Sequence, residues 1–153
     1  MAKTLLRVRD LRAGYGRAEV LHGLSITAEE GQVITVIGPN GAGKSTLLNA
    51  LMGALASTGT LEYAGKSVAL SSLEERVMLG MALVPETRAL FGAMSVEDNL
   101  LLGAWRQFRL GAKDSSKALN EVYMLFPGCA SGAPSLPERS PAASGRCSPS
   151  AAR

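Results

Sequence analysis

A glycine-rich stretch in the first third of the chain holds the residues best suited to chemistry. Residues 38–46 read "GPNGAGKST" and fit the pattern G-x-x-x-x-G-K-[ST]. Its glycines let the backbone bend around an anion and leave no Cβ in the way. Lys44 supplies an ammonium group for the outer phosphates, and Ser45 supplies a hydroxyl for Mg²⁺. The pattern therefore predicts a site for a nucleoside triphosphate and magnesium.

The elements around this loop are those that a phosphate site requires. The β-branched run "QVITVI", residues 32–37, predicts a strand that is covered on both faces. Residues 44–55 predict a helix whose positive end points at the bound anion. An ordinary glycine-rich turn is the alternative, but the complete pattern in this setting favours a phosphate loop. The residues predicted to bind the nucleotide there are Gly38, Pro39, Asn40, Gly41, Ala42, Gly43, Lys44, Ser45 and Thr46.

Further strands are predicted on both sides of the loop. Residues 4–10 and 20–27 alternate between apolar and polar types, which indicates strands with one buried face. The small residues "STGT", 57–60, predict a turn that leads into a short strand, "TLEYAG", at residues 60–65. "MALV", residues 81–84, predicts another short buried strand.

Two helix starts and one amphipathic helix are predicted in the second half. Ser72 with Glu75 forms the pattern of a capping box, and Ser95 with Asp98 repeats it with a shorter carboxylate. Residues 115–126, "SSKALNEVYMLF", predict a last amphipathic helix. The first 127 residues are therefore predicted to form an α/β domain.

Composition narrows the class of protein. An apolar content of 46% over 153 residues favours one globular domain. The charge of +3 with no run of Lys and Arg argues against a nucleic-acid partner. The N-terminus lacks the apolar core of a signal peptide, and no stretch approaches the ~18 apolar residues of a membrane span, so we expect a cytoplasmic chain. Cys129 and Cys147 lack neighbours at ligand spacing and are predicted to be neither metal ligands nor a disulfide.

The stretch "LHGLSITAEEGQVITVIGPNGAGKSTLLNALMG" resembles the ATP-binding subunits of ABC transporters. The resemblance implies an ABC-type P-loop NTPase core with an antiparallel β-subdomain and the start of a helical subdomain. It gives Tyr15, in "GYG", the role of stacking on adenine, where packing is the alternative. His22 precedes the loop and is therefore interpreted as a strand-surface residue, not as the family's catalytic histidine.

A second stretch, "VPETRALFGAMSVEDNL", resembles the subgroup that powers importers of branched-chain amino acids. There the family usually has a Gln that reaches Mg²⁺ and the attacking water, and Glu86 takes its place with a carboxylate that suits a hard cation. Ser45 and Glu86 are thus the predicted metal ligands. A solvated pair of Glu86 with Arg88 is the alternative. Phe91 and Met94 are either a patch for the permease or part of the core.

The resemblance implies ATP and Mg²⁺ as cofactors and several protein partners. They are membrane permease subunits, a second ATP-binding subunit and, indirectly, a periplasmic binding protein, with the chain held on the inner face of the cell membrane. The family's LSGGQ-type signature, its catalytic Glu and its switch His cannot be read in this chain. We therefore expect nucleotide binding without turnover. The alternatives are a permease-docking fragment and an ATPase subunit of another ABC transporter.

The last 26 residues, 128–153, differ from the rest, with six Ser, six Ala, four Pro and one large aliphatic residue, Leu136. Such a segment buries too little apolar surface to offset its ordering entropy and is predicted to be disordered. Read in a displaced frame, the codons from Glu138 onward permit T-L-S-G-G-E-R-Q-M-L-A-I-G-R-A, which resembles the subgroup's signature helix. We therefore interpret the tail as out of frame from near Gly128. A genuine low-complexity linker is the alternative.

Overall fold

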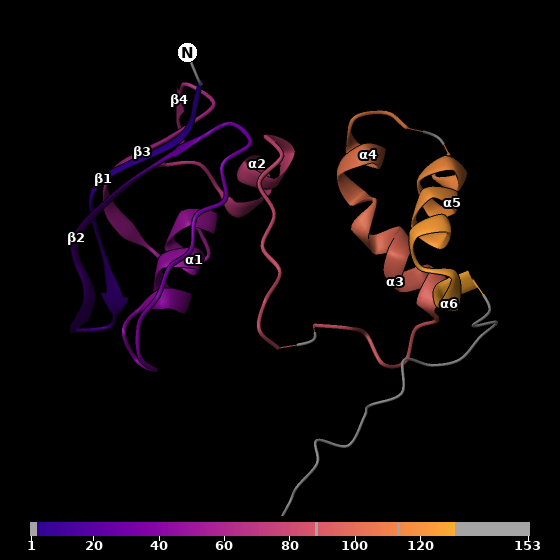
Figure 1. The fold of residues 1–153 in the computed structure, drawn as a ribbon, viewed down its shortest axis with the longest axis horizontal. Helices are drawn as coiled ribbons and strands as arrows, with labels where there is room; N and C mark the ends of the chain where they lie inside the picture. Colours follow the sequence, from indigo (N-terminus) through magenta and orange to yellow (C-terminus); the bar gives the residue numbers. More distant parts are fainter. Residues whose placement is uncertain (1–2, 88, 113, 131–153) are drawn as a thin grey trace, which may run out of the picture. The chain divides into compact units, whose positions relative to one another are not determined.

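The computed structural model describes residues 3–87, 89–112 and 114–130, which fall into two compact units, Met1–Val84 and Pro85–Arg153. Each unit is described by itself (Figure 1). The first holds β1 (Thr4–Tyr15), β2 (Ala18–Glu29), α1 (Lys44–Met52), β3 (Ser57–Tyr63), β4 (Lys66–Ser67) and α2 (Leu73–Met78). The second holds α3 (Val96–Gly103), α4 (Trp105–Arg109), α5 (Ser116–Leu125) and α6 (Pro127–Ala130).

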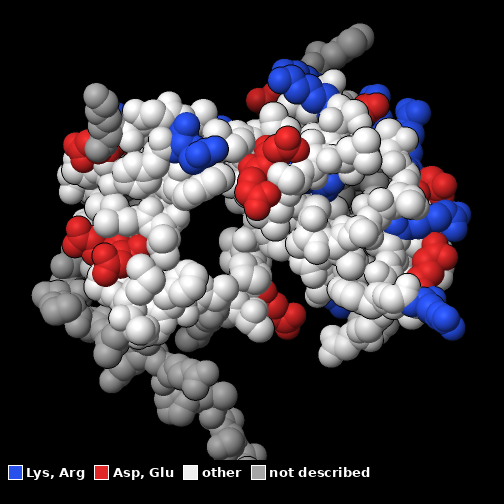
Figure 2. All heavy atoms as spheres, turned by 180° about the vertical axis from the view of Figure 1, so that it is seen from behind, with Lys and Arg blue, Asp and Glu red and all other residues white. Residues whose placement is uncertain are grey.

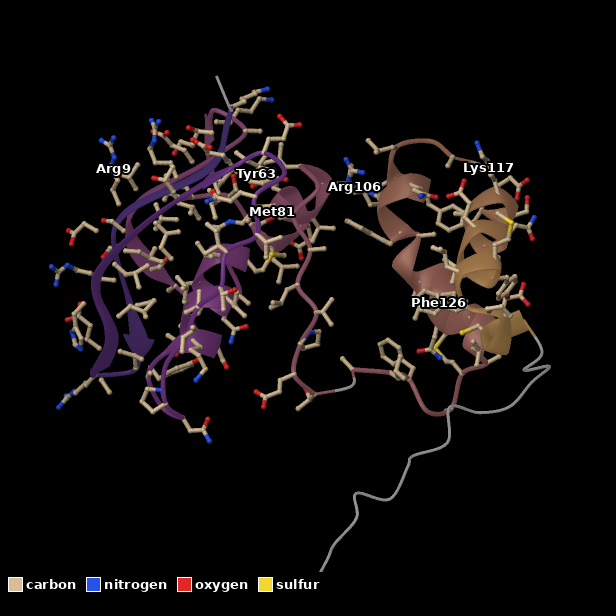
Figure 3. The ribbon with its side chains drawn as sticks, viewed as in Figure 1. Arg9, Tyr63, Met81, Arg106, Lys117 and Phe126 are labelled. Carbon is tan, nitrogen blue, oxygen red and sulfur yellow. The ribbon has the colours of Figure 1, made fainter. Side chains whose placement is uncertain are left out.

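The strands of the first unit form one antiparallel sheet in the order β2-β1-β3-β4. The strands predicted at residues 4–10 and 20–27 are confirmed as β1 and β2, and both are longer than predicted. Val8 and Leu11 of β1 are buried although three positions separate them, because Asp10 adopts a left-handed φ of 49° and adds a residue to the strand. Arg9 projects away from the sheet (Figure 3). This bulge keeps the apolar residues on one face.

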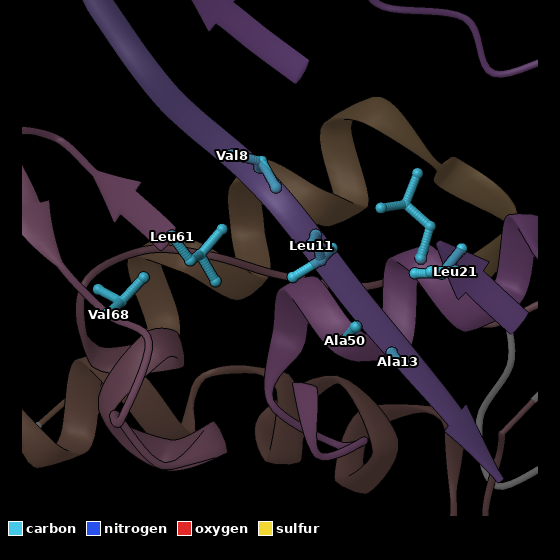
Figure 4. Packing of buried hydrophobic residues seen from close by; sticks show 8 residues of the cluster. Val8, Leu11, Ala13, Leu21, Ala50, Leu61 and Val68 are labelled. Atoms are coloured by element: carbon cyan, nitrogen blue, oxygen red, sulfur yellow. The ribbon is translucent and has the colours of Figure 1, made fainter. Parts of the chain in front are cut away.

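The core of this unit lies between the sheet and α1 (Figure 4). The predicted helix after the phosphate loop is confirmed, and it ends where Gly53 adopts a left-handed φ of 75° and donates its N–H to Ala50 O and Asn49 O. The buried cluster consists of Val8, Leu11, Ala13, Leu21, Leu47, Ala50, Leu61 and Val68. The helix that carries the phosphate loop is therefore fixed to the sheet by its apolar side.

The turn predicted at residues 57–60 is wrong, because these residues belong to β3. Ser57 and Thr58 pair with Ala13 and Arg12 of β1. Gly59, at a φ of 109°, lies against the backbone of the β1 bulge, where a Cβ would overlap the carbonyl oxygen of Asp10. Small residues are selected here by the close approach of two strands, so the composition that indicates a turn in isolation forms a strand beside β1.

The buried strands predicted at residues 32–37 and 81–84 are also wrong. Both segments lie outside any helix or strand. Val33, Ile37 and Val84 are 90%, 89% and 90% exposed. A strand needs a hydrogen-bonded neighbour, and within the described ranges neither segment has one. A β-prone composition without a partner strand leaves the chain extended and its apolar side chains open to solvent.

The predicted helix starts are confirmed. Ser72 Oγ accepts from Glu75 N at 3.2 Å and Glu75 Oε2 accepts from Ser72 N at 2.8 Å, which completes the capping box of α2. Ser95 caps α3 by accepting from Asp98 N at 3.1 Å, but its hydroxyl donates to Asp98 Oδ2 at 2.7 Å, so that carboxylate does not return to the backbone. The last amphipathic helix is confirmed as α5, whereas α4 and α6 were not predicted.

The predicted boundary between the domain and the tail can be compared with the last described helix. The boundary placed between residues 127 and 128 falls within α6, which also holds Cys129. Residues 131–153, and with them Cys147, lie outside the described residues.

No helix in the described ranges has the length and apolar composition to cross a membrane. Figure 2 shows that basic and acidic side chains are interspersed on the face it presents, without a stripe of one sign.

Candidate phosphate-binding site

Glycines shape the loop between residue 37 and α1. Gly41 and Gly43 have φ values of 86° and 88°, in the left-handed region that side chains disfavour. Gly43 is also confined by β2, because a Cβ there would lie 3.0 Å from Val20 Cγ1 and 3.1 Å from Leu21 Cδ2. The loop thus turns into α1 at a position where any other residue would strain the backbone and push against the Val20 and Leu21 side chains.

The Lys44 side chain folds back over the loop. Its Nζ donates to Gly38 O and to Pro39 O, both at 2.8 Å, and Ala42 N donates to Pro39 O at 3.2 Å. An ammonium group has three hydrogens, so one remains for an outside acceptor. These bonds hold a positive charge at the mouth of the loop, where an anionic ligand is expected.

The N-terminus of α1 supplies further donors. Gly43 offers no side-chain cap, and the first turn contains no acidic residue. Leu47 N donates to Gly43 O at 2.8 Å. The amides of Lys44, Ser45 and Thr46 have no acceptor within the described part of the chain. These free N–H groups at the positive end of a helix fit a phosphate. Ser45 is exposed, whereas Thr46 is only 6% exposed.

Glu86 and the phosphate loop belong to different units of the chain. It is exposed and lies outside any helix or strand, in the unit that begins at Pro85, whereas Ser45 belongs to the other unit. Ser45 therefore fits a hard cation by its exposed hydroxyl, and its pairing with Glu86 stays a prediction. Arg88, the proposed partner of Glu86 in the surface-pair alternative, lies outside the described residues.

Tyr15 is the last residue of β1 and is 54% exposed, as a stacking residue requires. A cavity of about 360 Å³ lies next to it, lined by residues on both sides of Tyr15 and by β3 residues such as Ser57, but not by Tyr15 itself. Arg12 lines the same cavity. Its pKa is raised, first by the hydrogen bond to Asp10 and then by the charges of Asp10 and Glu19. The stacking role of Tyr15 stays a prediction.

His22 occupies the strand surface, as predicted. It lies in β2 with a side chain that is 70% exposed, and its Nδ1 is 3.7 Å from Glu19 Oε2. It faces a carboxylate of its own strand.

Sequence reasoning missed Arg76, which supports the helix that carries the phosphate loop. Arg76 is 2% exposed, and its guanidinium donates to Ala50 O at 2.9 Å and Leu51 O at 2.7 Å. It also donates to Ser71 O at 3.2 Å and Ala69 O at 3.3 Å. A cation on the last carbonyls of α1 complements the negative end of the helix. A single Arg in a short polar helix carries no pattern that predicts this burial.

Asn99 was missed as well. Its side chain accepts from Phe91 N at 3.0 Å and donates to Phe91 O at 3.2 Å and Ser95 O at 2.9 Å. It thereby closes the loop before α3. Phe91 is 59% exposed on that loop and Met94 is half-buried. Phe91 is therefore not part of the core, and the predicted patch for the permease stays a prediction.

Comparison with known proteins shows which family this chain belongs to. A sequence model described as ABC transporter matches residues 21–132. The high-affinity branched-chain amino acid transport ATP-binding protein BraG of Pseudomonas aeruginosa is 36% identical over 114 residues, which are 74% of this chain and 48% of that protein. The ribose import ATP-binding protein RbsA of Bacillus licheniformis is 34% identical over 113 residues, 73% of this chain and 23% of that protein.

Solved structures agree with these sequence relatives. The crystal structure of a nucleotide-free ATP-binding cassette from an ABC transporter superposes with a TM-score of 0.60 at 33% identity, over 65% of this chain and 40% of that one. The chain thus spans half or less of the length of each of these relatives. The antiparallel sheet, the helices and the phosphate loop are those of one family, and the chain belongs to the ABC transporters as part of their ATP-binding domain.

Proposed function

We propose that this chain binds ATP and Mg²⁺ through residues 38–46, as part of an ABC importer subunit for branched-chain amino acids. One observation carries the proposal. In a chain of this family, Lys44 and the free amides of α1 converge on the loop where a triphosphate is expected. Ser45 would contact the cation, and Tyr15 would stack on the adenine. Bound magnesium would supply neutralisation of phosphate charge.

Two features support the substrate class. The stretch "VPETRALFGAMSVEDNL" resembles the branched-chain amino acid subgroup, and BraG is named for that transport. RbsA, by contrast, is named for ribose import, so a sugar importer is the competing assignment. Co-purification with the permease subunits of a branched-chain amino acid importer and, separately, with those of a ribose importer distinguishes the two assignments.

The partners and the place of action follow from the same proposal. The chain docks on membrane permease subunits at the inner face of the membrane, next to a second ATP-binding subunit, and a periplasmic binding protein delivers the substrate on the other side. Glu86 is the second metal ligand of this proposal, because its carboxylate suits a hard cation. Because the signature, the catalytic Glu and the switch His cannot be read in the chain, it binds nucleotide without hydrolysing it.

Ligand-dependent thermal unfolding tests the binding proposal. With Mg²⁺ present, ATP or ADP should raise the melting temperature of the full chain, since a ligand that binds only the folded state stabilises it. Lys44→Ala should abolish this rise because the ammonium group at the loop mouth is lost. Lys66→Ala is the matched control, since Lys66 is exposed on β4 of the same unit and should leave the rise unchanged.

Each result has a defined meaning. A rise that is equal in Lys44→Ala and the parent chain would place the nucleotide elsewhere and overturn the proposal. The absence of any rise in a folded sample would overturn it as well. Unfolding curves without nucleotide show whether either substitution has changed the fold.

A further inference from the structure

Arg76 carries a buried positive charge that its neighbours neutralise only in part. The residue is 2% exposed, and none of the described carboxylates forms an ion pair with it. Its four acceptors are backbone carbonyls, which supply partial negative charge and no full charge. Taking a charge out of water is costly, and buried charges are in general paired with an opposite charge. The surroundings of Arg76 thus favour an anion.

The guanidinium also keeps one donor for such an anion. A guanidinium has five N–H groups. Nε donates to Ser71 O, the two Nη1 hydrogens go to Ala50 O and Leu51 O, and Nη2 donates to Ala69 O. One Nη2 hydrogen therefore has no acceptor in the described part of the chain. Arg76 can form a further hydrogen bond without giving up its support of α1.

A cavity of about 220 Å³ lies beside this guanidinium, and Arg76 forms part of its wall. Ser57 and Ser71 add hydroxyl groups to the wall, Leu55 and Leu70 add apolar surface, and the remaining lining residues are glycine or alanine. All of them lie in the first unit. Pockets of this kind, with a few polar groups in an apolar setting, fix one polar end of a small ligand.

Charge and lining narrow the class of ligand. A carboxylate carries one negative charge, which matches the single charge of Arg76, and it accepts short charge-assisted hydrogen bonds. A phosphate group carries about two charges and would leave one of them uncompensated. The leucine side chains suit a short aliphatic tail. We propose that this cavity binds a small aliphatic monocarboxylate, whose carboxylate pairs with the Arg76 guanidinium.

This inference goes beyond nucleotide binding and does not depend on it, because residues 38–46 do not line the cavity. Titration of the ¹⁵N-labelled full chain with butyrate tests it by NMR. The Nε–H resonance of Arg76 and the amide resonances of Ser57 and Ser71 should shift and reach saturation. Butyramide has the same size without the charge and should leave these resonances in place.

Variants that keep the guanidinium test the location. Ala56→Leu should weaken butyrate binding about tenfold, because the added side chain fills the cavity from its wall. Ala18→Leu is the matched control, since Ala18 is exposed and lines only the neighbouring cavity next to Tyr15, to which Ala56 also belongs. Lys44→Ala should leave the titration unchanged, which separates this cavity from the phosphate loop.

The parent chain alone can refute the proposal. If butyrate causes no saturable shift of the Arg76 resonance, or butyramide causes an equal one, the cavity is not a carboxylate site. Equal affinity in Ala56→Leu and the parent chain would place the ligand elsewhere. Loss of the shifts in Lys44→Ala would assign the butyrate to the phosphate loop and overturn the proposal as well.

Discussion

At the scale of single residues, Arg76 shows how a buried charge can support a binding loop from a distance. Its guanidinium bonds to four backbone carbonyls and has no carboxylate partner among the residues described. Burial lowers its pKa. Gly53 makes the approach possible, because a Cβ there would lie 3.0 Å from Arg76 Cζ. The far end of α1 is thus held while its first turn carries the phosphate loop.

Arg76→Met should lower the free energy of unfolding by about 1–3 kcal/mol, because the buried carbonyls of α1 lose their donor while the apolar stem is kept. Urea denaturation measures the change. Arg17→Met is the matched control, since Arg17 is exposed in the β1–β2 turn and should change stability by less than about 0.5 kcal/mol. An equally small change in Arg76→Met would contradict the supporting role.

At the scale of elements, helices here form from local signals, whereas strands depend on neighbours. The start of α5 has its own local device, in which Asp114 Oδ1 accepts from Ser116 N at 2.8 Å and Oδ2 accepts from Ser116 Oγ at 2.7 Å. The hydrogen bonds to the Ser116 side chain and backbone lower the Asp114 pKa. The ionised carboxylate therefore favours the folded start of α5.

The sign of the pH dependence follows from that lowered pKa. The contribution of Asp114 is complete above its unfolded pKa of about 3.9 and is lost as the pH falls through the lower folded value. The amide resonance of Ser116 should report a titration midpoint below the ordinary aspartate value. Ser116→Ala should move the midpoint up, and Asp114→Asn should abolish the titration. A midpoint at the ordinary value in the parent chain would refute this account.

At the scale of the whole molecule, the chain spans about half of BraG. If the tail is out of frame, the coding DNA downstream of Phe126 spells the signature in the displaced frame. A frame-corrected gene product should then hydrolyse ATP, whereas the present chain should bind it without turnover. Phosphate release measures both, with Lys44→Ala in the corrected chain as the inactive control. Turnover by the present chain would contradict the prediction.

The features that the sequence determined by itself are local. The helix after the glycine-rich loop and the Ser72 capping box depend on residues within a few positions of one another, and each was predicted where it forms. The β1–β2 hairpin is nearly local, since only the turn at Gly16 and Arg17 separates its strands.

Only the tertiary structure decided the features that depend on distant partners. Residues 57–60 became a strand because β1 lies beside them, and residues 32–37 did not because no strand of the described residues pairs with them. Arg76 is buried because α2 meets the end of α1, 25 residues earlier in the chain. The physical reason is common to all three. Strand pairing and the satisfaction of a buried charge are set by groups that the fold brings together, and no local pattern encodes which groups those are.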